Sequence, residues 1–117
     1  MKITQREVGN AVILDLNGKL QGGADADTFR EVFKSLVDQG KKNVIVNLEK
    51  VSWINSTGLG ILISGYTSVR RAGGDLVVMR ASDRIESILY VTKLNLLFKS
   101  YEAEDEALKA FSATASE

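Results

Sequence analysis

Two hydroxyl side chains and two glycines stand together in the middle of the chain, in the run NSTGLG at residues 55–60. The run follows an apolar stretch at residues 44–48 and opens a segment with amphipathic helical spacing, so the hydroxyls fall where a helix begins. A helix start carries unpaired N–H groups and partial positive charge, which stabilise hydroxyl caps and bound anions. A hydroxyl group in that position is accessible and can carry a phosphate.

Four interpretations of this turn are open at the level of the sequence. As a phosphoacceptor, Ser56 would gain about two negative charges and so break an apolar or acidic contact with a partner. A phosphate-binding loop is disfavoured because no GxxxxGK[ST] pattern and no following lysine are present. A nucleophilic serine lacks both the GxSxG arrangement and a histidine to activate it. In a purely structural interpretation Ser56 caps the helix, and Gly58 and Gly60 let the helix pack closely on a sheet.

Composition excludes several classes of protein. The chain has 117 residues and no cysteine, histidine or proline, which removes disulfides, thiolate metal sites and the commonest general base. Basic and acidic residues balance at 15 each, so no bulk field attracts nucleic acid or anionic lipid. No apolar stretch reaches the ~20 residues that a membrane helix needs, and the N-terminus is unlike a signal peptide. We therefore expect a cytoplasmic protein without cofactor or metal, without nucleic-acid binding or membrane insertion, and present as a monomer or a weak dimer.

Hydrophobic periodicity predicts a single α/β domain at residues 1–111, followed by a tail at 112–117 that we expect to fray. Strands are predicted at residues 3–8 and 11–16 around a Gly9-Asn10 turn, at 44–48 and at 76–79, with a short strand near 97–99. Helices are predicted up to Gly40, over 56–72, from Ser82 or Asp83, and after an acidic first turn at 104–106. The first of these helices has three possible caps, at Asp25, Asp27 and Thr28. The pattern predicts a mixed, mostly parallel four- to five-stranded sheet with an N-terminal antiparallel hairpin and about four helices.

Residues 44–48 and then 51–60 resemble the signature of STAS domains, V-x-(aromatic)-(apolar)-D-S-[ST]-G-L-G, in its form in bacterial anti-sigma factor antagonists. The Gly73-Gly74 turn before the next strand is similar to the corresponding turn of that family. The resemblance implies a protein that is a substrate and a ligand, and not an enzyme. In the family, the unphosphorylated antagonist binds a GHKL-type serine kinase that is also the anti-sigma factor, and this binding releases the sigma factor. The kinase phosphorylates the serine that maps to Ser56, and a PP2C-type phosphatase restores the antagonist.

The resemblance thus implies phosphorylation at Ser56, with Thr57 as the second choice. The partner-binding residues that we expect on this basis are the turn, the loop beside it and the aromatic residue before it: Asn55, Ser56, Thr57, Gly58, Leu59, Gly22, Gly23 and Trp53. The tryptophan lies near a strand end, where a rim-packing role is the simpler interpretation and an exposed ring would mark a contact surface.

Three departures from the family pattern concern the partner more than the fold. Asn55 stands where the family has aspartate, which keeps the shape and an acceptor but loses the charge. The family's G-E-[LI]-D is GKLQ at residues 18–21, and Lys93 replaces a frequent glycine at a helix stop, at a cost of about 1 kcal/mol. Asn55 and the altered loop at residues 18–25 favour an alternative function, a STAS interaction module that is not phosphorylated. Such a module would be a scaffold of a sensory complex or a cytoplasmic accessory subunit of a lipid transporter.

Overall fold

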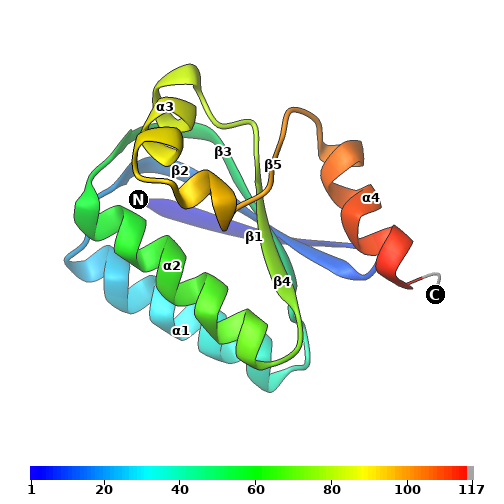
Figure 1. Cartoon of the computed structure of the whole chain (residues 1–117). Coiled ribbons are helices and arrows are strands. Elements are labelled where there is room, and N and C mark those ends of the chain that lie inside the picture. Colours follow the sequence, from blue (N-terminus) through cyan, green and yellow to red (C-terminus); the bar gives the residue numbers. More distant parts are fainter. Residues whose placement is uncertain (116–117) are drawn as a thin grey trace.

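Five strands form one sheet in the order β1-β2-β3-β4-β5 in the computed structural model, which describes residues 1–115 (Figure 1). The elements are β1 (Lys2–Val8), β2 (Ala11–Leu20), α1 (Ala24–Asp38), β3 (Asn43–Ile54), α2 (Ser56–Arg71), β4 (Asp75–Met79), α3 (Asp83–Val91), the 3₁₀ turn η1 (Leu94–Leu96), β5 (Ser100–Tyr101) and α4 (Glu104–Ala115). Strands β1 and β2 pair antiparallel, and every other neighbouring pair is parallel. The predicted fold class is confirmed.

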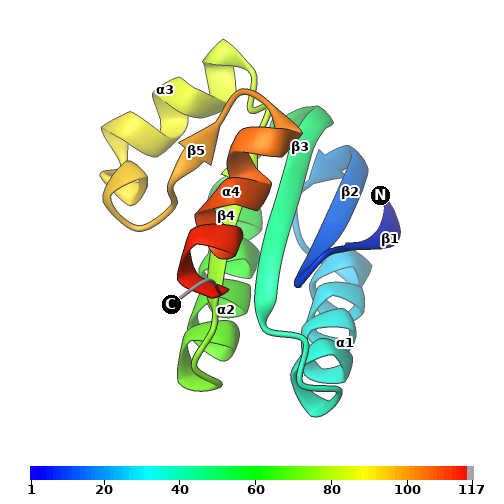
Figure 2. The same cartoon turned by 90° about the vertical axis from the view of Figure 1, so that its right-hand side faces the viewer.

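Helices cover both faces of the sheet, so the inner strands are apolar on both sides. Helices α1, α2 and α3 cover one face, where alternate residues of β2 such as Val12 and Leu14 pack against Phe29, Phe33 and Leu62. Figure 2 shows α4 on the opposite face, above β3 and β4. There Ala107 and Phe111 of α4 pack on a smaller apolar cluster formed by Ala11, Ile13, Ile45, Val77 and Met79.

Strands β2 and β3 are longer than the apolar pattern predicts. The prediction stopped at residues 16 and 48, whereas the strands reach Leu20 and Ile54. Exposed Glu49 and Lys50 interrupt the apolar run, but parallel pairing with β2 continues from Lys50, opposite Asn17, to Ile54, opposite Leu20, with a register shift on each side of Gly18. Trp53 therefore lies within β3, paired with Lys19, and these extended strand ends position the turn at residues 55–58.

Element boundaries depart from the predictions at three places, two in helices and one in a strand. Gly23 precedes the first residue of α1 and makes no side-chain cap, so the three predicted caps of this helix are wrong. Gly22 and Gly23 both have positive φ angles, which complete the turn without a capping side chain. The last strand begins at Ser100, later than predicted, because η1 occupies residues 94–96. Helix α4 continues to Ala115, so the tail expected to fray overlaps its last turn, and residues 116–117 lie outside the described part of the chain.

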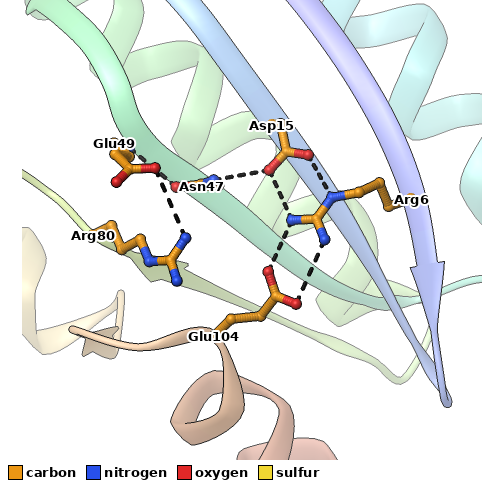
Figure 3. A network of polar contacts seen from close by, with 6 residues as sticks. All are labelled: Arg6, Asp15, Asn47, Glu49, Arg80 and Glu104. Atoms are coloured by element: carbon orange, nitrogen blue, oxygen red, sulfur yellow. Dashed lines mark hydrogen bonds and ion pairs between the residues drawn. The ribbon is translucent and has the colours of Figure 1, made fainter.

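A polar network ties the first strands to the last helix (Figure 3). The Arg6 guanidinium donates to both carboxylate oxygens of Asp15, at 2.6 and 3.0 Å, and to Glu104 of α4 at 2.9 Å. The Asn47 amide donates to Asp15 at 2.8 Å. The hydrogen bonds from Arg6 lower the pKa of Asp15 below its ordinary value, and the two carboxylates raise the pKa of Arg6.

Candidate functional site

The turn between β3 and α2 is capped by Asn55 and not by a hydroxyl. The Asn55 backbone is extended, and its side-chain Oδ1 accepts a hydrogen bond from the Gly58 N–H at 2.9 Å. Asparagine is among the best capping residues, so replacing the family's aspartate keeps this function of the side chain. The interpretation of Ser56 as the helix cap is therefore wrong, because Ser56 is the first helical residue.

Ser56 presents a free hydroxyl at the surface. Its side chain is exposed, and within residues 1–115 it makes no hydrogen bond. The backbone N–H groups of Ser56 and Thr57 also have no partner within this part of the chain, since the capping oxygen is used by Gly58. No acidic residue lies in the first turn of α2. An anion attached to Ser56 would thus meet two unpaired donors and the positive end of a 16-residue helix.

The loop between β2 and α1 lies directly against this turn. The Asn55 backbone N–H donates to the Leu20 carbonyl at 3.3 Å, and its side-chain amide donates to the Gln21 carbonyl at 3.4 Å. A Cβ atom on Gly22 would lie 2.4 Å from the Thr57 methyl group, so the two segments are in close contact. The two loops therefore form one continuous surface, as the resemblance implied.

Thr57 differs from Ser56 in its surroundings although both are exposed. The Thr57 methyl group packs against the backbone of the β2–α1 loop, where only glycine leaves room for it. Gly23, the next residue of that loop after Gly22, has a φ of 67°, and its carbonyl accepts the first hydrogen bond of α1, from the Ala26 N–H at 3.1 Å. The Thr57 side chain thus holds the two loops together, while the Ser56 side chain has no such contact.

Gly58 and Leu59 lie on the inner side of the turn. Gly58 is buried, and a Cβ atom there would lie 2.0 Å from the Leu20 carbonyl oxygen. Leu59 is only 8% exposed and belongs to the core cluster beneath α2. These two residues fix where the exposed turn lies and offer little surface of their own.

Trp53 exposes 41% of its surface at the end of β3 and stands beside a residue that the sequence did not single out. The Arg84 guanidinium lies 5.3 Å from the centre of the Trp53 ring, in cation–π geometry. Arg84 belongs to the first turn of α3, which follows the parallel strand β4 and so begins at the same end of the sheet as the Ser56 turn.

Of the helices that the structure describes, none is long and apolar enough to span a membrane.

The mixed sheet and this glycine-rich turn are the features that define a STAS domain. Residues 2–107 match the STAS domain family, and the chain belongs to that family. A relative in Staphylococcus aureus, named anti-sigma-B factor antagonist, is 30% identical over 90 residues, which cover 74% of this chain and 83% of the relative.

Solved structures agree with this assignment. The crystal structure of TM1081 from Thermotoga maritima has a TM-score of 0.84 and 26% identity and covers 92% of each chain. SpoIIAA, an anti-sigma factor antagonist solved in its unphosphorylated form, has a TM-score of 0.73 at 17% identity over 97% of this chain and 98% of its own. At that identity the likeness to SpoIIAA concerns the fold alone.

Proposed function

We propose that this protein is an anti-sigma factor antagonist that works in the cytoplasm and is switched by phosphorylation at Ser56. In its unmodified form it binds an anti-sigma factor that is also a GHKL-type serine kinase, and this binding releases a sigma factor. Phosphorylation ends the binding, and a PP2C-type phosphatase reverses the modification. The protein itself is a ligand and a substrate, and the catalytic groups belong to the kinase and the phosphatase.

The observation that carries this proposal is the exposed, unpartnered Ser56 hydroxyl at the start of α2. The hydroxyl oxygen would attack the γ-phosphorus of ATP, the bond from that phosphorus to ADP would break, and the hydroxyl proton would pass to a base of the kinase. The product phosphate has two unpaired N–H groups and a helix dipole beside it, so the fold tolerates the added charge. Names of relatives support the same function, and SpoIIAA has also been solved in a phosphorylated form.

Ser56 is preferred over Thr57 as the acceptor because of what each side chain contacts. The Thr57 methyl group lies against Gly22 and helps to hold the two loops together, so moving that side chain into a kinase active site disturbs the loop contact. Asn55 next to the acceptor carries no charge, whereas an aspartate there would repel the incoming phosphate. Asparagine at position 55 is therefore as compatible with phosphorylation of Ser56 as the family's aspartate is.

Incubation with the cognate anti-sigma factor kinase and ATP tests the site. Intact-mass measurement should show one added phosphate on the wild-type protein and on Thr57→Ala, and none on Ser56→Ala. Ser56→Asp should lose affinity for the kinase by at least about tenfold while its thermal midpoint stays within a few degrees of wild type, because the side chain is exposed. Phosphate on Ser56→Ala would refute the site, and no phosphate on the wild type would favour the unphosphorylated interaction module.

A further inference from the structure

Large apolar side chains are exposed in one small region of the surface. Of the six large apolar residues that the described chain exposes, four lie within residues 90–97. Their exposed fractions are 73% for Tyr90, 78% for Val91, 80% for Leu96 and 39% for Leu97. We call these four residues the α3–η1 patch. Exposed apolar side chains concentrated in one short segment in this way indicate an interaction site on a soluble protein.

The core does not require these side chains. Helix α3 turns Ile85 and Leu89 inward, at 2% and 1% exposure, and Phe98 after η1 is equally buried. Tyr90 and Val91 follow on the outer side of the same helix, and Leu96 lies on the outer side of η1. Polar residues at positions 90, 91 and 96 would remove little buried apolar surface, so the packing of the domain does not require apolar side chains there.

The helix that carries Tyr90 and Val91 begins at the same end of the sheet as the Ser56 turn. Helix α3 begins at the carboxyl end of β4, and the Ser56 turn begins at the carboxyl end of the parallel neighbour β3, as Figure 1 shows. The Arg84–Trp53 contact ties the first turn of α3 to the end of β3, next to the Ser56 turn. The nine residues of α3 span about 13 Å, whereas a standard interface of roughly 800 Å² per partner is about 32 Å across. One protein partner can therefore contact both regions.

Area decides between a second copy of this chain and a different partner. At the exposed fractions given above, the four side chains offer on the order of 500 Å². A symmetric dimer formed through the patch alone would fall short of the ~800 Å² per partner that a stable complex needs. A stable partner therefore covers surface beyond the patch, and the Ser56 turn is the part of the proposed binding surface that it would add.

The charges around the patch indicate the chemistry of the partner. Between residues 84 and 99 the side chains of Arg84, Lys93 and Lys99 are exposed cations. The carboxylates of this region, Asp83 and Glu86, lie in the first turn of α3, where Glu86 accepts a hydrogen bond from the Ser100 hydroxyl; within residues 87–99 the charged side chains are Lys93 and Lys99. A complementary surface has an apolar centre edged by carboxylates. A phosphate on Ser56 would repel those carboxylates, which connects the patch to the switch.

We propose that the α3–η1 patch is the second half of the partner-binding surface. On this proposal, which rests on the function proposed above, the kinase that modifies Ser56 covers both regions with an apolar surface edged by carboxylates. The Ser56 turn determines whether the kinase binds, and the patch supplies much of the apolar contact. Sequence reasoning did not find the patch, because a Tyr-Val pair and a Leu-Leu pair in a helical segment are ordinarily core residues.

The affinity of the purified kinase for patch variants tests this proposal. A triple variant, Tyr90→Ser with Val91→Ser and Leu96→Ser, should weaken binding at least about tenfold, because buried aromatic and aliphatic anchors carry most of an interface's energy. The matched control, Tyr90→Phe with Val91→Ile and Leu96→Met, keeps the apolar surface and should bind within about threefold of wild type. Both variants should keep the wild-type thermal midpoint within a few degrees, since the side chains are exposed.

The outcomes separate the two proposals. Unchanged affinity of the serine triple variant, with binding abolished by Ser56→Asp, would overturn the patch and leave the proposed function standing. A wild-type protein that neither binds the kinase nor accepts phosphate would overturn both. Sedimentation equilibrium measures the oligomeric state of the same proteins. If the wild-type protein is a dimer and the serine triple variant is a monomer with unchanged kinase affinity, the patch binds a second copy of the chain and the proposal is overturned.

Discussion

Gly58 and Gly60 lie two positions apart in α2 and have opposite surroundings, which gives a sharp test of how the turn is built. A Cβ atom on Gly58 would lie 2.0 Å from the Leu20 carbonyl oxygen and 3.1 Å from the Ile54 side chain. A Cβ atom on Gly60 would have no such neighbour within 4 Å. Gly58→Ala should therefore destabilise the protein, and Gly60→Ala should stabilise it.

The size of each effect follows from these distances. Ordinary contact begins at 3.4 Å, so Gly58→Ala requires α2 or the Leu20 carbonyl to move by about 1.4 Å. That carbonyl accepts the Asn55 backbone N–H at 3.3 Å, which restrains it. Overpacking of this kind costs about 1–3 kcal/mol, whereas alanine for glycine in a free helical position contributes about 0.5–1 kcal/mol of stability. For a domain of this size we expect the thermal midpoint to fall by roughly 4–12 °C for Gly58→Ala and to rise by roughly 2–4 °C for Gly60→Ala.

Thermal and urea denaturation of the two variants measure these changes, with circular dichroism as the signal. Phosphorylation provides a second measurement, because moving the start of α2 also moves Ser56. Gly58→Ala should therefore slow phosphate incorporation at a temperature where the variant is fully folded, and Gly60→Ala should not. Equal changes in stability for the two variants, of either sign, would refute the close approach of α2 to Leu20.

Three further predictions concern other parts of the molecule. The pKa of Asp15 is lowered by its hydrogen bonds from Arg6, so the pair stabilises the fold above the ordinary pKa of an aspartate, and this stability is lost as the pH falls through the folded-state value. In a plot of the urea midpoint of unfolding against pH, Asp15→Asn should therefore reduce the fall of the midpoint at acid pH. An unchanged fall would contradict the assignment. Lys93 has a φ of 63°, so Lys93→Gly should raise stability by about 0.5–1 kcal/mol in the same denaturation assay, and a loss would argue against the left-handed conformation. Asn55→Asp keeps the capping oxygen but loses the side-chain N–H that donates to the Gln21 carbonyl. We therefore expect the free energy of unfolding to change by less than about 1 kcal/mol and hydrogen exchange in the β2–α1 loop to become faster. Unaltered exchange would show that this hydrogen bond does not hold the loop.

Local signals in the sequence account for the elements that were predicted well. The Gly9-Asn10 turn between two alternating segments gave the hairpin, and the helical spacing from Ser56 gave α2 to within one residue. Ser82 was one of two predicted caps of α3, and it does accept the Ile85 N–H, at 3.3 Å. In each case residues close together in the chain carry the whole signal.

Features that depend on distant residues were not predictable. The extension of β3 to Ile54 depends on its pairing with β2. The hydrophobic pattern of the sequence does not show this extension, because the charged Glu49 interrupts the pattern. At the site, the sequence located the turn but not its cap, because asparagine, serine and threonine are all capable of capping and only the backbone geometry selects Asn55. The Arg84–Trp53 contact joins two parallel strand ends, and a search for cations in the first turn after β4 could have found it.

The polar network has a consequence for how the chain is made. One of the two carboxylate partners of Arg6, Glu104, is synthesised 98 residues after it. Until then the apolar side chains of Ile13, Ile45 and Val77 have no covering helix, and a nascent or prematurely terminated polypeptide exposes them to chaperones and to other chains. Synthesis and docking of α4, and not the growth of the sheet alone, is thus the step that covers this second apolar face.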